Sequence, residues 1–122
     1  MTKKIFAVLI LAGFMQMSSL IKAEANDMAY GYCMVNVGSR GDKVKVVSTV
    51  YRVRRNTYHV GIQNSFRDYV DANFAAGADS TPSCGASTET WQEAEDERNR
   101  SVGRLRGDGW TVHAVNWAYH GK

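Results

Sequence analysis

The sequence predicts an α+β domain, in which a small antiparallel sheet carries two helices packed on one face and is held by one disulfide. Residues 30–37 and 43–53 alternate or are rich in β-branched side chains, a pattern typical of strands. Between 64 and 77, and again between 90 and 107, apolar side chains recur every three or four positions, a pattern typical of helices. Strands that precede helices in this order favour an α+β arrangement.

The first two predicted strands form a hairpin. Cys33 shares one face of its strand with two valines, and residues 38–42 are dense in the glycine, serine and aspartate that favour turns. Residues 43–53 supply the returning strand. After the break at residues 54–57, residues 58–62 are either a short third strand or a loop.

Capping residues mark both predicted helices. Asn64 or Ser65 caps the first helix and Gly77 ends it, whereas Thr90 and Glu93 fit a capping box at the start of the second. We expect the helices to bury an apolar set on the sheet: Phe66, Val70, Phe74, Trp91, Val102 and Leu105.

The last predicted strand, residues 110–119, is apolar or aromatic on both sides. Such a strand is either central in a sheet or part of an interface. If no other part of the chain covers it, a second copy must, so a homodimer is one expected partner.

The first 25 residues are predicted to be a cleaved signal peptide. Met1–Lys4 is basic, an apolar stretch follows, and Ala23-Glu24-Ala25 fits a small-x-small cleavage site. Residues 5–21 are too short and too interrupted by polar side chains for a spanning helix, so no membrane anchor is expected. Residues 26–122 then form a single α+β domain in the periplasm.

Removal of this leader changes the charge. The formal net charge of the whole chain is +3, and it falls to +1 when Lys3, Lys4, Lys22 and Glu24 are lost. A nucleic-acid-binding protein needs a surplus of cations on one face, so nucleic acid is not an expected partner.

Both cysteines lie in the part predicted to be exported. In an oxidising compartment, Cys33 and Cys84 have one intramolecular pairing, and we expect a disulfide between them. The alternatives are a catalytic thiol or a metal site. The chain has no Cys-x-x-Cys motif and no histidine adjacent to either cysteine, which favours the structural bond.

Residues suited to catalysis are few. His59, His113 and His120 lack the spacing of zinc ligands, and no serine stands in a nucleophile elbow. The carboxylates of Glu93 and Glu97 share one exposed helix face rather than flanking a groove. We therefore predict no metal, no cofactor and no enzymatic activity.

The densest polar and aromatic cluster spans residues 51–59. Tyrosine and arginine dominate many protein interfaces, because they combine a large contact area with a forked charge. A second interpretation is an edge strand that positive charge keeps soluble. The candidate partner-binding residues are Tyr51, Arg52, Arg54, Arg55, Tyr58 and His59.

The layout as a whole resembles the periplasmic immunity proteins of type VI secretion systems that oppose peptidoglycan-degrading, lysozyme-like effectors. An export signal, one small domain and two cysteines carry this resemblance, which is one of size and layout and transfers no site residue. The aromatic helix before Cys84, the Glu93-Ala94 pair and the final Val112 and Trp117 also resemble uncharacterised secreted bacterial domains. That second resemblance implies no function.

The resemblance implies a protein that binds a cell-wall hydrolase and occludes its cleft. Arginine can pair bidentately with cleft carboxylates, and Arg54 and Arg55, flanked by Tyr51 and Tyr58, best suit that role. The alternative is a secreted or periplasmic module that binds peptidoglycan or an envelope protein without inhibiting anything. A small enzyme is the third interpretation.

Overall fold

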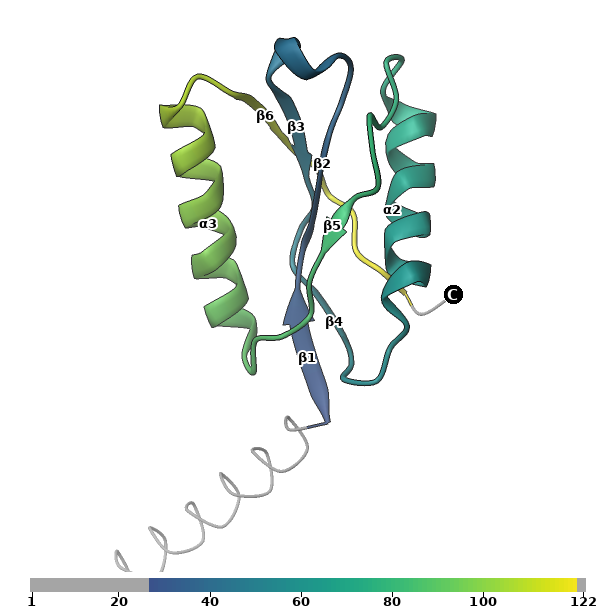
Figure 1. The fold of residues 1–122 in the computed structure, drawn as a ribbon. Helices are drawn as coiled ribbons and strands as arrows, with labels where there is room; N and C mark the ends of the chain where they lie inside the picture. The colour runs from purple at the N-terminus through teal and green to yellow at the C-terminus, as the bar shows by residue number, and fades with distance from the viewer. Residues whose placement is uncertain (1–26, 121–122) are drawn as a thin grey trace, which may run out of the picture.

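The structure, a computed structural model, describes residues 27–120, apart from the side chain of Arg40. The predicted signal peptide and its cleavage site lie outside these residues. Figure 1 shows a sheet between two helices. The elements in chain order are β1 (Met28–Gly31), β2 (Cys33–Asn36), the 3-10 helix η1 (Arg40–Asp42), β3 (Val44–Val47), β4 (Tyr51–Arg54), α2 (His59–Asn73), β5 (Ser83–Cys84), α3 (Trp91–Gly107) and β6 (Thr111–Ala114).

The predicted hairpin is confirmed, and it is long and bent. Strand β2 pairs antiparallel with β3, and β1 pairs antiparallel with β4 beyond the bend. The bend brings Gly31 against the loop after β5, where a Cβ on Gly31 would lie 1.6 Å from the Gly85 oxygen. Only glycine allows this close approach of two backbones.

The four-stranded part of the sheet has the order β5-β2-β3-β6, and the last pair is parallel. The prediction of an antiparallel sheet is therefore wrong for β6, and the sheet is mixed. Parallel neighbours need a long crossover connection. Here the chain between β3 and β6 contains β4, both helices and β5, which provides that length.

The two helices cover opposite faces of the sheet, which corrects the prediction that both pack on one face (Figure 1). Val46 is buried with Phe66 of α2, whereas its neighbour Val47 is buried with Val102 of α3. Successive residues of a strand point to opposite faces, so these two valines belong to different layers. The structure is nonetheless an α+β fold with one disulfide, as predicted.

Helix α2 begins earlier than the capping residues indicated. It runs from His59 to Asn73, so residues expected to form a third strand or loop form its first turn. Ile62 is buried one turn before Phe66, and this extends the apolar stripe toward the N-terminus. Gly77, with a φ of 69°, lies in the turn after the helix.

Helix α3 begins where predicted. The Thr90 side chain accepts a hydrogen bond from the Glu93 N–H at 3.1 Å, which satisfies a donor that the first turn leaves open. Ala94 and Val102 are its buried residues. Trp91, expected in the core, has 49% of its surface exposed, so that prediction is wrong.

The C-terminal strand is shorter than predicted, because β6 ends at Ala114. The chain then turns toward α2, and the Trp117 ring packs 4.9 Å from Phe66 and 6.1 Å from Tyr51, between ring centroids. The apolar side chains of this segment are thus taken up within the chain. A second copy is not needed to cover them, and the homodimer stays a prediction.

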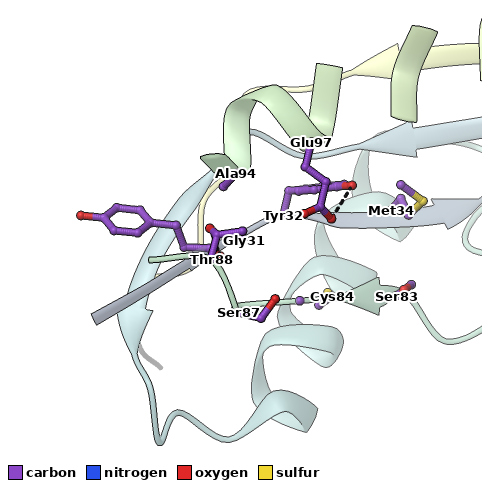
Figure 2. Close-up of a pocket in the computed structure, with 11 residues that line it drawn as sticks. Gly31, Tyr32, Met34, Ser83, Cys84, Ser87, Thr88, Ala94 and Glu97 are labelled. Carbon is purple, nitrogen blue, oxygen red and sulfur yellow. Dashed lines mark hydrogen bonds between the residues drawn. The ribbon is translucent and has the colours of Figure 1, made fainter. Parts of the chain in front are cut away.

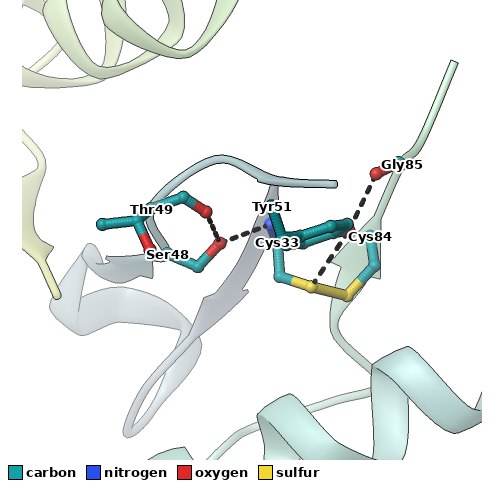
Figure 3. The surroundings of a disulfide bond; sticks show 6 residues. All are labelled: Cys33, Ser48, Thr49, Tyr51, Cys84 and Gly85. Atoms are coloured by element: carbon teal, nitrogen blue, oxygen red, sulfur yellow. Dashed lines mark hydrogen bonds between the residues drawn. A yellow bond between two sulfur atoms is a disulfide. The ribbon is translucent and has the colours of Figure 1, made fainter. Parts of the chain in front are cut away.

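The predicted disulfide is confirmed between Cys33 and Cys84, which lie directly opposite each other in the β2–β5 pair (Figure 3). The Cys33 N–H donates to the Ser48 hydroxyl at 2.8 Å, and the Tyr51 hydroxyl donates to the Gly85 oxygen at 2.7 Å. The bond therefore ties the centre of the hairpin to the segment that leads into α3.

Candidate partner-binding surface

Strand β4 divides the predicted cluster between the core and the surface. Tyr51 and Val53 are buried, whereas Arg52 and Arg54 are exposed, as the alternation of a strand requires. Only 2% of the surface of Tyr51 is accessible. Tyr51 is therefore not placed to contact a partner, and its prediction as a partner-binding residue is wrong.

Tyr51 instead supports the interior. Its hydroxyl donates a hydrogen bond to the Gly85 oxygen, and its ring packs against Trp117 in a T-shaped arrangement. Burial raises the pKa of Tyr51 well above its ordinary value, because the charged phenolate would lose its hydration. The residue holds the bend of the hairpin against the loop that follows β5.

The remaining five candidates lie close together along the chain and are all exposed: Arg52, Arg54, Arg55, Tyr58 and His59, which we call the basic surface. Arg52 and Arg54 project from the exposed face of β4, opposite Tyr30 and Met28 of β1. Tyr58, which precedes α2, has 75% of its surface exposed. An aromatic ring this exposed is available for burial against another molecule.

The basic surface borders an open groove of about 580 Å³. The lining of the groove comes from β1, β4, the turn that follows β4 and the C-terminal segment. None of the described residues that line the groove is acidic: Met28, Arg52, Val53, Arg54, Thr57, Tyr58, Tyr119 and His120. The groove therefore favours an anionic occupant.

One carboxylate lies near the far side of this surface. Asp27, Arg54, Arg55 and Asn56 line a separate shallow depression, and the Arg55 N–H donates to the Asp27 carbonyl at 3.1 Å. Asp27 therefore offsets part of the charge of Arg54 and Arg55, but it does not enter the groove.

The arginines of α3 provide a contrast. Arg98 donates to the Ser48 carbonyl and lies 3.8 Å from a Glu95 carboxylate oxygen. The acidic Glu93 lies in the first turn of this helix and the basic Arg104 and Arg106 lie in its last turn, so charges of both signs share the helix. Such an arrangement suits the helix dipole.

A second depression lies between β5 and α3 and has a volume of about 170 Å³ (Figure 2). The Tyr32 hydroxyl lies in it, 3.0 Å from the Ser101 hydroxyl and 3.5 Å from a Glu97 carboxylate oxygen. Pockets that hold small molecules are usually 300–1,000 Å³. This depression is smaller, and its Tyr32 hydroxyl already lies within hydrogen-bond distance of Glu97 and Ser101.

Comparison with protein families, with curated proteins and with solved structures finds no match to this chain. Among residues 27–120, no three His, Cys, Asp or Glu side chains are grouped to hold a metal ion. In the same part of the chain, no helix is long and apolar enough to cross a bilayer.

Sequence reasoning found the arginines but missed Tyr119 and His120 as groove residues. They come from a segment far from β4 along the chain, and no local pattern links the two. The burial of Tyr51, in contrast, had a signal. Tyr51 and Val53 alternate with Arg52 and Arg54, which predicts that the tyrosine and the arginines lie on opposite faces.

Proposed function

We propose that this chain is an exported, periplasmic immunity-type binding protein, which inhibits a cell-wall-degrading, lysozyme-like hydrolase by occluding its active-site cleft. The observation that carries the proposal is the groove beside β4, whose described lining residues include two arginines and a histidine and no acidic side chain. A glycan hydrolase cleft contains catalytic carboxylates, and guanidinium groups complement them. The disulfide is compatible with export to an oxidising compartment.

The basic surface supplies the contacts in this proposal. No hydrogen bond or ion pair joins the side chains of Arg52 and Arg54 to the rest of the described chain, so neither must break a contact to reach a carboxylate. Tyr58 adds apolar area next to them. Aromatic and arginine side chains are the residues whose truncation most often weakens an interface.

The test is inhibition of purified lysozyme-like effector muramidases, followed as the clearing of a suspension of cell-wall sacculi. We expect one enzyme of the panel to be inhibited stoichiometrically. The double variant Arg52→Ala/Arg54→Ala should raise the inhibition constant about 100-fold, since two lost charge-assisted contacts together cost roughly 3 kcal/mol.

The matched control is Arg100→Ala/Arg104→Ala, which removes the same charge from the exposed face of α3. We expect it to change the inhibition constant less than about threefold, because distant charges act only through screened fields. Equal losses in the two double variants would contradict the site. Retention of the chain on bare sacculi, with no enzyme inhibited, would support the wall-binding module instead.

A further inference from the structure

Between residues 27 and 120, β1 is the strand that pairs with β4, so the outer edge of β4 has backbone groups without a strand partner there. In an antiparallel pair, every second residue turns its N–H and C=O toward the partner strand. The Arg55 N–H donates to the Asp27 oxygen, so residues 51, 53 and 55 face β1. Arg52 and Arg54 therefore turn their backbone groups away from β1.

The hydrogen bonds on the other edge of β1 confirm which residues of this pair turn their backbone groups outward. Tyr30, the cross-strand partner of Arg52, exchanges two backbone hydrogen bonds with Thr88, at 3.0 and 3.3 Å. Tyr30 thus faces away from β4, as Arg52 faces away from β1. The outer edge of β1 is therefore paired at this point, whereas the described part of the chain places no such partner at the outer edge of β4.

Of the four backbone groups that Arg52 and Arg54 turn outward, one has a partner in the described residues. The Arg54 carbonyl accepts a hydrogen bond from the Thr57 N–H at 2.9 Å. The Arg52 N–H, the Arg52 carbonyl and the Arg54 N–H have no hydrogen-bond partner in the described part of the chain. Unpaired edge groups of this kind are a template for a further strand.

Within the described residues, no strand lies next to this edge of β4, because the C-terminal segment stops pairing with β3 after Val115. Strand β6 covers the edge of β3 up to Ala114, and the Val115 N–H still bonds to Val47. Beyond that point Trp117 packs into the core on the α2 side. Tyr119 and His120 of this segment line the groove beside β4 but form no strand pair with it.

The charge of this edge selects the occupant. A strand added here would place alternate side chains about 5 Å from Arg52 and Arg54, where carboxylates would be stabilised. A second copy of β4 would instead oppose arginine with arginine, which is unfavourable. We propose that β4 binds an extended segment of another protein, with Asp or Glu at alternate positions, as an added strand.

This inference rests on the proposed function in assigning the segment to the inhibited hydrolase, but edge pairing can be tested without any enzyme. The probe is a synthetic peptide, acetyl-Thr-Glu-Val-Glu-Val-Thr-amide, titrated into the isotope-labelled chain and followed by NMR. At saturation, we expect amide hydrogen exchange at Arg52 to slow at least tenfold. Val53, already paired with β1, should change little.

Two matched peptides separate charge from backbone pairing. A peptide with Lys in place of both Glu should bind at least tenfold more weakly. A Glu peptide N-methylated at alternate amides keeps its charge but cannot pair as a strand, and it too should bind at least tenfold more weakly. The variant Arg52→Ala/Arg54→Ala should weaken the original peptide, and Arg100→Ala/Arg104→Ala should not.

Each outcome decides between the proposals. Unchanged exchange at Arg52 and Arg54, or equal binding of the N-methylated peptide, would overturn strand addition. If a hydrolase were still inhibited, the proposed function would survive that failure. If the peptide bound as expected and no hydrolase were inhibited, strand addition would stand and the inhibitor role would fall.

Discussion

The two faces of the sheet differ in how they are built. On the α2 face, Phe66, Ile62 and Val70 are fully buried against the hairpin, and the disulfide and Trp117 close the cluster. On the α3 face, Val102 contributes the main apolar contact, next to Val47. The comparison teaches that one helix is part of the core, whereas the other rests on the sheet through a narrow apolar stripe.

The largest expected effect lies on the α2 face. Phe66 is fully buried, so Phe66→Ala should lower the free energy of unfolding by about 4–5 kcal/mol, through lost burial and an unfilled cavity. Urea denaturation followed by circular dichroism would measure it. Phe66→Leu, which keeps most of the volume, should cost far less, and equal losses would contradict a packing role.

Removal of the disulfide should have the next largest effect. Cys33→Ala/Cys84→Ala frees a loop with a sequence separation of 51. The chain-entropy model gives a loss of about 4 kcal/mol for a loop of this length. Guanidinium denaturation should give the same loss in the free energy of unfolding for the variant and for the wild-type chain under reductant. A loss below about 1 kcal/mol in both measurements would show that the stability of the α2 face does not depend on this bond.

On the α3 face the matching substitution should cost less. Val102→Ala removes two methyl groups from a nearly buried site, and we expect the free energy of unfolding to fall by about 2 kcal/mol. Urea denaturation checks this value. If Val102→Ala cost as much as Phe66→Ala, the contrast between the two faces would not hold.

The burial of Tyr51 in the cluster on the α2 face should make the free energy of unfolding depend on pH. The unfolded chain loses the phenolic proton near pH 10, whereas burial raises the pKa of the folded Tyr51 above that value. The folded state therefore binds more protons above pH 10, and its stability should fall by about 1 kcal/mol by pH 11. Denaturation of wild type and Tyr51→Phe at pH 8 and 11 isolates this term, which the variant should lack.

The smallest effect is expected at Trp91. Half of its surface is exposed at the start of α3, so Trp91→Ala should change the free energy of unfolding by less than about 0.5 kcal/mol. Thermal denaturation would detect a larger change. A loss above about 1.5 kcal/mol would mean that this tryptophan packs on the sheet after all.

Local patterns predicted the parts of the fold that local forces determine. The cap at Thr90 and the strand at Cys33 follow from side chains a few positions apart. The face of the sheet that each helix covers does not follow from such patterns. An apolar stripe shows that a helix is buried, but it does not show against which face of the sheet. The parallel direction of β6 likewise depends on distant partners.

The candidate surface divides in the same way. Arg52 and Arg54 could be predicted because both alternate with buried neighbours in one strand. His120 could not, because it reaches the groove only through the turn of the chain after β6. The open backbone edge of β4 could not be predicted either, because it depends on the pairing of β4 with β1, a distant strand earlier in the chain.

The parallel pairing of Val44 with Thr111 sets an order of events for a chain made from its N-terminus. Hairpin contacts form between near neighbours, but β3 gains its second partner only after both helices have been synthesised. Distant pairings of this kind slow folding. Until then β2 is the neighbour with which β3 can pair, and the edge of β3 that β6 later covers stays open to solvent.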